Sequence, residues 1–213
     1  MKQLILKDII KKIENKENFA FSRFGDGEWN NIQKRPGKNC DGNIYFHELG
    51  DRLKSIVENK QDYYIGSQNL IWNLPSGVDE YKANFYHDSD VFHFASMEGK
   101  LQPLFDVLKK TYVVYIGNHF HKPLPFINEF IEIPMSNVWT QYDITLSTIK
   151  NTIIDNKHKL YLISAGMCAN IFVHDLWNNN KNNSYIDIGS VFDPFVGRNS
   201  RKYHKNLTTK SYE

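Results

Sequence analysis

The chain has 213 residues and a formal net charge of +2, which suits one domain and lacks the strong basicity of a dedicated nucleic-acid-binding protein. Hydrophobic residues make up 41% and charged residues 23% of it, as in globular rather than disordered proteins. The two cysteines are far apart, which argues against a disulfide. The N-terminal segment is charged, which argues against a signal peptide, and no apolar stretch approaches the ~20 residues of a membrane span, which argues against a membrane anchor. We therefore expect a cytoplasmic protein.

The first half of the chain alternates predicted helices and strands. Leucine and isoleucine recur at helical spacing over residues 3–16, and a short strand follows at 18–24. A helix is predicted at 48–58 and a strand at 63–66. Strands at 91–94 and 112–116 flank a helix at 101–109.

The second half repeats this rhythm, with an extended piece at 130–134, a helix at 143–154, strands at 159–164 and 185–188, and a helix at 168–177 between those strands. The alternation predicts an α/β domain with a mostly parallel sheet flanked by helices, spanning residues 1–197. A basic C-terminal tail, residues 198–213, follows it. Ligands of such sheets bind outside the carboxyl ends of the strands, so the residues that follow the strands are the candidate site residues.

Two carboxylates, Asp26 and Glu28, follow the strand at 18–24. Gly25 and Gly27 would let the backbone aim both acids at one point. Mg²⁺ and Mn²⁺ commonly take one or two protein carboxylates together with substrate phosphates, and Arg23 could pair with a phosphate. The spacing alone also fits an ordinary surface turn, because Asp-Gly is a common turn pair.

Polar residues follow two other predicted strands. Asn118 and His119 come after the strand at 112–116, where either could contact a phosphate and His119 could act as a catalytic base; local hydrogen bonding is the alternative. Ser164 and Gly166 precede a predicted helix, whose N-terminus attracts anions. A tight turn that needs glycine for packing explains Gly166 equally well.

The last predicted strand is followed by further candidates. Asp187 and Asp193 each suit a ribose or sugar contact or a catalytic base, and each also suits the more common role of a turn cap. The tail carries five basic residues and one acid, Glu213. The basic residues are Arg198, Arg201, Lys202, Lys205 and Lys210. The tail is either a solvated terminus or an arm that meets an anionic partner such as phosphate or nucleic acid.

The string Arg23-Phe-Gly-Asp-Gly-Glu28 after a strand resembles the signature of the GT-D-type glycosyltransferases. Later segments are similar to the middle and C-terminal parts of that family, so the resemblance spans most of residues 18–193; they are Ile133 to Asp143, Leu160 to Asn170, His174 to Leu176 and Tyr185 to Gly189. The resemblance implies a Rossmann-like fold, a UDP-sugar donor, and nucleotide-sugar and metal binding by Asp26 and Glu28. The turn at 164–169 lacks a proline common in relatives, which leaves its ligand contacts open.

The sequence thus predicts a glycosyltransferase, either a hexosyl- or a pentosyltransferase, that moves a sugar from a UDP-sugar to an acceptor hydroxyl with Mn²⁺ or Mg²⁺. A glycan, a glycoprotein or a modified DNA base is the acceptor, the last implying a viral enzyme in the host-cell cytoplasm. A metal-dependent phosphohydrolase or nucleotidyl-transfer enzyme, and a nucleotide-binding module without catalysis, are the alternatives. The candidate catalytic residues are Asp26, Glu28 and His119, and the candidate donor-binding residues are Arg23, Gly25, Gly27, Asn118, Ser164, Gly166 and Asp187.

Overall fold

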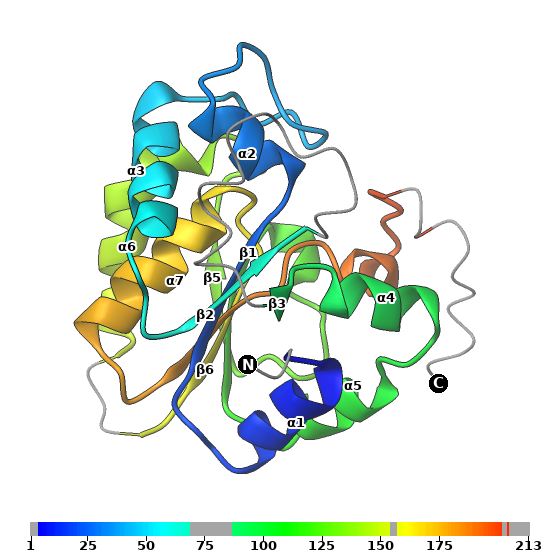
Figure 1. Ribbon diagram of the computed structural model, residues 1–213. Coiled ribbons are helices and arrows are strands. Elements are labelled where there is room, and N and C mark those ends of the chain that lie inside the picture. The colour runs from blue at the N-terminus through cyan, green and yellow to red at the C-terminus, as the bar shows by residue number, and fades with distance from the viewer. Residues whose placement is uncertain (1–3, 69–86, 154–156, 202–203, 205–213) are drawn as a thin grey trace.

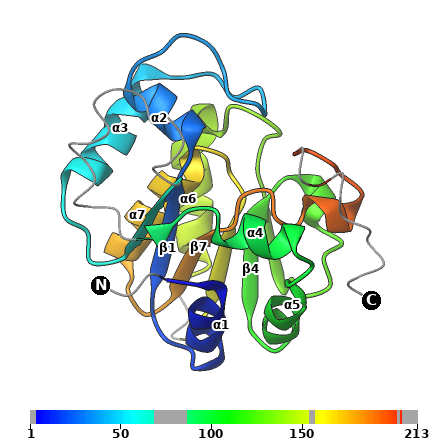
Figure 2. The same ribbon diagram turned by 45° about the vertical axis from the view of Figure 1, so that its right-hand side comes forward.

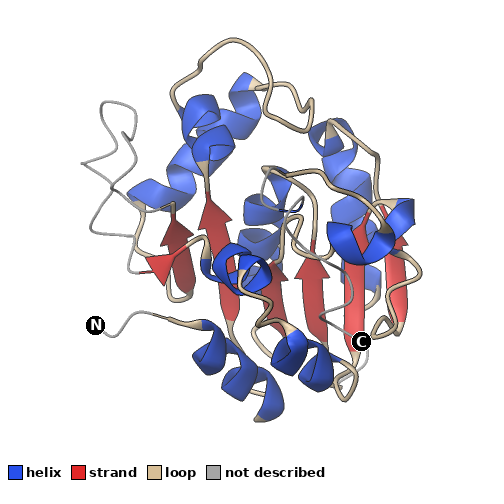
Figure 3. Cartoon of the chain, turned by 90° about the vertical axis from the view of Figure 1, so that its right-hand side faces the viewer, coloured by secondary structure: helices blue, strands red, loops and turns tan. Residues whose placement is uncertain are grey.

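Seven parallel strands form one sheet in the order β3-β2-β1-β7-β6-β4-β5. The computed structural model describes residues 4–68, 87–153, 157–201 and 204. The strands are β1 (Ala20–Phe24), β2 (Tyr64–Ser67), β3 (His87–Asp88), β4 (Val113–Gly117), β5 (Glu129–Glu132), β6 (Leu160–Ile163) and β7 (Ser184–Asp187). Figure 3 shows their arrows pointing the same way, so their carboxyl ends meet at one edge. The single parallel α/β domain confirms the predicted fold class.

Helices cover both faces of the sheet (Figures 1 and 2). On one face lie α2 (Asp26–Ile32), α3 (His47–Glu58), α6 (Tyr142–Asn151) and α7 (Cys168–Asn179). On the other lie α1 (Leu6–Glu14), α4 (Val91–Met97) and α5 (Gln102–Leu108). The described residues also include the 3₁₀ turns η2 (His119–His121), η3 (Val138–Gln141) and η4 (Asp193–Val196).

The core lies in two layers because the central strands are buried on both sides. Every residue of β1, β4, β6 and β7 is buried, which accounts for the continuous apolar runs of β4 and β6. Trp29 and Phe172 pack in the layer under α3 and α7, and Phe92 and Phe192 pack in the opposite layer. Within the described residues, no helix is long and apolar enough to cross a membrane.

The order of the strands creates a crevice. From β1 the chain runs outward through β2 to β3, then crosses to β4 on the far side of β7. Loops beside such a reversal leave the sheet in different directions, so a ligand site is expected outside the carboxyl ends there. The loops that follow β1, β4, β6 and β7 surround this point.

One predicted strand is wrong: residues 91–94 belong to helix α4. The short run Val-Phe-His-Phe reads as a buried strand because both phenylalanines look like core residues. In the helix Phe92, Ala95 and Ser96 are buried at helical spacing. The second phenylalanine, Phe94, is 48% exposed. The sequence analysis also missed α2 and the two-residue β3.

Candidate active site

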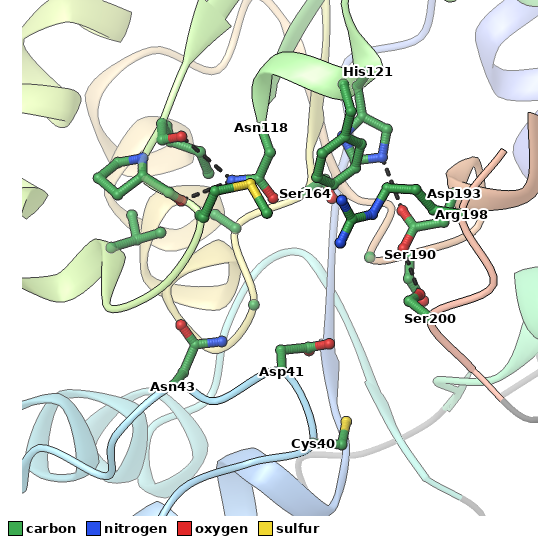
Figure 4. Close-up of a pocket in the computed structure, with 18 of the residues that line it drawn as sticks. Cys40, Asp41, Asn43, Asn118, His121, Ser164, Ser190, Asp193, Arg198 and Ser200 are labelled. Atoms are coloured by element: carbon green, nitrogen blue, oxygen red, sulfur yellow. Dashed lines mark hydrogen bonds and ion pairs between the residues drawn. The ribbon is translucent and has the colours of Figure 1, made fainter. Parts of the chain in front are cut away.

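Two adjoining cavities lie at the carboxyl ends of the strands. The acidic cavity, about 350 Å³, is bordered by the start of α2, the end of β7 and α4, and its acids are Asp26, Glu28, Asp41, Asp90 and Asp187. The arginine cavity, about 340 Å³, is bordered by the segments after β4 and β6 and by the C-terminal segment with Arg198 and Arg201 (Figure 4). The residues common to both are Cys40, Asp41, Gly166, Gly189, Ser190 and Arg201.

The two signature carboxylates lie in the first turn of α2 rather than in a free turn. Gly25 is the N-cap, and its N–H donates to Glu28 Oε2 at 2.9 Å. A helix N-terminus favours carboxylates. Asp26 is exposed and Glu28 is partly buried, and both line the acidic cavity. The expected role of the glycines is wrong, because neither Gly25 nor Gly27 has a positive φ; a Cβ on Gly25 would instead lie 3.3 Å from Glu28 Oε2.

The pKa of Glu28 is raised to about 7. Burial is the largest cause, and the negative charges of Asp187 and Asp26 add to it. The hydrogen bond from the Gly25 N–H opposes the rise by favouring the ionised form. Glu28 therefore exchanges a proton near neutral pH, and a bound cation would drive it to the carboxylate.

Arg23 and Asp187 form the floor of the acidic cavity. The buried Arg23 guanidinium donates from Nε to the Asp187 carbonyl oxygen at 2.8 Å and from Nη1 to the Ser89 carbonyl oxygen at 3.0 Å. Its Nη2 lies 3.5 Å from Asp187 Oδ1. Gly189, with φ +56°, passes so close that a Cβ there would lie 2.1 Å from Nη2. Burial raises the pKa of Asp187, and Arg23 opposes that rise.

A second pair, Asp90 and His93, enters the acidic cavity from α4. Asp90 Oδ1 lies 2.9 Å from His93 Nδ1, and His93 Nε2 lies 3.4 Å from Arg23 Nη1. Burial lowers the pKa of His93, so the neutral imidazole is favoured. Neither residue is among the predicted site residues, since a strand was predicted at 91–94 where α4 begins.

Three predicted donor-binding residues line the arginine cavity: Asn118, Ser164 and Gly166. Asn118 donates from Nδ2 to the Pro134 carbonyl oxygen at 2.7 Å, so its amide also holds the segment after β5. Gly166 has φ +55°, and a Cβ there would lie 3.2 Å from Asn43 Nδ2. Its backbone reaches the junction of the two cavities because no side chain intervenes.

His119 lies apart from the other predicted residues. It is exposed on η2 and is not among the residues that line either cavity. His121 is the histidine that lines the arginine cavity; it is buried, and its Nε2 lies 2.9 Å from Asp193 Oδ1. Asn118, the residue before η2, and His121, its last residue, both line the arginine cavity. The sequence analysis had no signal for that turn.

The predicted site residues therefore fall into two groups and one outlier. The acidic cavity brings together Arg23, Gly25, Asp26, Gly27, Glu28 and Asp187. The arginine cavity holds Asn118 and Ser164, and Gly166 belongs to both. The functional roles predicted for these residues, and for His119, stay predictions.

Three solved structures are similar to this chain. One, described as a new glycosyltransferase (domain of unknown function 1792) from Streptococcus sanguinis, has a TM-score of 0.70 at 16% identity and covers 92% of this chain and 83% of that one. A second, described as showing that this highly conserved domain has a distinct glycosyltransferase fold, has a TM-score of 0.64 at 17% identity over 92% and 80% of the two chains. A selenomethionine-substituted structure of the same domain has a TM-score of 0.67 at 16% identity, with the same coverage.

In sequence, no protein-family model and no curated protein matches the chain. At sequence identities of 16–17%, the similarity to these structures shows the fold alone. At that level the resemblance seen in the sequence is confirmed. The chain thus has the distinct glycosyltransferase fold found in domain of unknown function 1792.

Proposed function

We propose that the protein transfers a sugar from a UDP-sugar to an acceptor hydroxyl. One observation carries the proposal: in a glycosyltransferase fold, Asp26, Glu28 and Asp187 converge on a cavity outside the carboxyl ends of β1 and β7. A crevice beside a reversal in strand order is the usual ligand site of open α/β sheets. The family resemblance of the Asp-Gly-Glu signature supports a nucleotide-sugar as the ligand.

The reaction sets what the site must supply. The acceptor oxygen bonds to the anomeric carbon while the bond from that carbon to the diphosphate breaks, and UDP leaves with the electron pair. The acceptor proton passes to a base. Negative charge grows on the leaving diphosphate, so preorganised positive groups and donors near it contribute most to the rate.

A divalent cation fits the acidic cavity in one specific way. Among the described residues, no three His, Cys, Asp or Glu side chains gather into a ready-made metal centre. Mg²⁺ and Mn²⁺, however, often take only one or two carboxylates and complete their shell with water and substrate phosphates. Asp26, exposed to the cavity, and the free oxygen of Glu28 would hold such an ion. When bound, it would neutralise charge on the diphosphate.

The acceptor is a glycan, a glycoprotein or a modified DNA base, and the transferred sugar a hexose or a pentose. The two cavities join at Gly166, Gly189 and Ser190, which leaves room for a donor and an acceptor side by side. Mass spectrometry of products formed from oligosaccharide, protein and DNA acceptors separates these classes.

The primary test measures UDP release from a panel of UDP-sugars with Mn²⁺ or Mg²⁺. Asp26→Asn and Glu28→Gln should each lower kcat/KM at least about tenfold, because each weakens the hold on the metal and diphosphate. Asp51→Asn is the matched control: this exposed acid pairs with Lys34 at 2.9 Å, outside both cavities. Full activity in both site variants would overturn the roles of Asp26 and Glu28. Cleavage of simple phosphoesters instead of UDP-sugars would favour a phosphohydrolase.

A further inference from the structure

Asp193 anchors the start of the C-terminal tail against the domain. Gly197, with φ +77°, ends η4 and turns the chain. The Arg198 N–H then donates to the Asp193 carbonyl oxygen at 2.9 Å, and Ser200 Oγ donates to Asp193 Oδ2. The other carboxylate oxygen of this buried aspartate faces His121 Nε2 at 2.9 Å. Residues 198–201 are thus held over the arginine cavity, whereas Lys202, Lys205 and Lys210 lie outside the described residues.

The guanidinium of Arg198 lies over an aromatic ring and has no carboxylate partner among the described residues. Its Cζ lies 4.0 Å from the centroid of the Phe120 ring, and Figure 4 shows the side chain reaching into the cavity opposite Asp41 and Cys40. In the described part of the chain no carboxylate pairs with it. Stacking fixes the plane of the group while leaving its edge N–H donors available to an anion.

Arg201 lies at the junction of the two cavities and lines both. Its Nη1 and Nη2 donate to the two carboxylate oxygens of Asp41 at 2.6 and 2.8 Å. The pair joins the C-terminal segment to the loop before α3. Both partners are partly exposed, so a phosphate that reaches the junction would compete with Asp41 for the same guanidinium donors.

The charge of the cavities shows why these arginines matter. Five carboxylates line the acidic cavity, and a diphosphate placed beside them needs cations. Across the described lining of both cavities the arginines are Arg23, Arg198 and Arg201, and no lysine is present. Arg23 is buried and committed to Asp187 and Ser89. Arg198 has no carboxylate partner among the described residues, and Arg201 shares its charge with Asp41 at the junction of the cavities.

We propose that Arg198 and Arg201 form a diphosphate-binding clamp across the junction of the two cavities. The planar guanidinium matches phosphate oxygens in pairs, which gives orientation as well as charge neutralisation. That the diphosphate belongs to a UDP-sugar rests on the proposed function; the clamp itself requires only a diphosphate. In the transfer reaction the two arginines bind the leaving group as its negative charge grows.

The test is calorimetric binding of UDP, uridine and inorganic pyrophosphate at one saturating Mg²⁺ concentration, so that any metal contribution is common to all variants. Arg198→Ala and Arg201→Ala should each weaken UDP and pyrophosphate binding by about tenfold to a hundredfold, the usual effect of losing a charge-assisted hydrogen bond. Binding of uridine, which has no phosphate, should be unchanged. Arg198→Lys should lie between wild type and Arg198→Ala, since it keeps the charge and loses the fork.

Arg35→Ala is the matched control, because Arg35 is exposed, lines neither cavity and carries the same charge. Thermal unfolding of each variant checks that the fold is intact. Unchanged UDP affinity in both site variants, or an equal loss for uridine, would overturn the clamp, as would a wild type that binds neither UDP nor pyrophosphate. If the wild type binds pyrophosphate through the arginines but neither binds nor turns over UDP-sugars, the clamp stands and the proposed function fails.

Discussion

Glu28→Gln is expected to stabilise the protein at alkaline pH, because burial and two neighbouring acids disfavour the ionised carboxylate. The pKa of Glu28 rises from its ordinary value of 4.5 to about 7 in the folded protein. Between these values the folded state holds a proton that the unfolded state has lost, so the free energy of unfolding falls as the pH rises through this window. Glutamine carries no charge, and its side-chain oxygen can still accept from the Gly25 N–H.

The size of the effect follows from the pKa rise. A rise from 4.5 to about 7 corresponds to roughly 3 kcal/mol above pH 7. Because part of the carboxyl faces solvent, we expect about 2 kcal/mol at about pH 8.5 and less than about 1 kcal/mol at about pH 5. The same substitution should lower activity, which is the usual exchange of stability for function in an active site.

Urea unfolding at a series of pH values, with EDTA present and no nucleotide, measures this difference. Glu48→Gln is the matched control, because Glu48 also lies in the first turn of a helix, α3, but is exposed. Its effect should be small and independent of pH. A Glu28→Gln variant whose stability tracks the wild type at every pH would refute the idea that the fold disfavours the ionised form.

Three further predictions concern other parts of the protein. Gly189→Ala should lower the free energy of unfolding by at least about 2 kcal/mol, since its Cβ would lie 2.1 Å from Arg23 Nη2 at a φ of +56°; a thermal melt like that of the wild type would contradict this. His121→Ala should destabilise the protein by about 2 kcal/mol, because the buried Asp193 keeps its bond from Ser200 but Oδ1 loses His121, and should lower UDP release. His119→Ala, outside both cavities, should change neither, and a large loss of turnover there would instead support His119 as the base.

Much of the architecture was readable from local patterns. The buried strands β4 and β6 carry continuous apolar runs, and such runs between helical patterns indicate a parallel sheet. The strand predicted at 91–94 is wrong because a run of four mostly apolar residues fits a buried strand and a helix equally well. Its misreading hid Asp90 and His93 from the list of site residues.

The sequence by itself determined the fold class and one side of the site, because Arg23, Asp26 and Glu28 are close in the chain and follow a clear strand. Tertiary structure alone decided which distant residues join them. Burial and then the approach of Asp187 raise the pKa of Glu28, and the contacts of Asp193 place the start of a basic tail in the wall of a cavity. Such contacts depend on strand order and loop path, and spacing along the chain does not encode the distance between residues 26 and 187 or between 41 and 201.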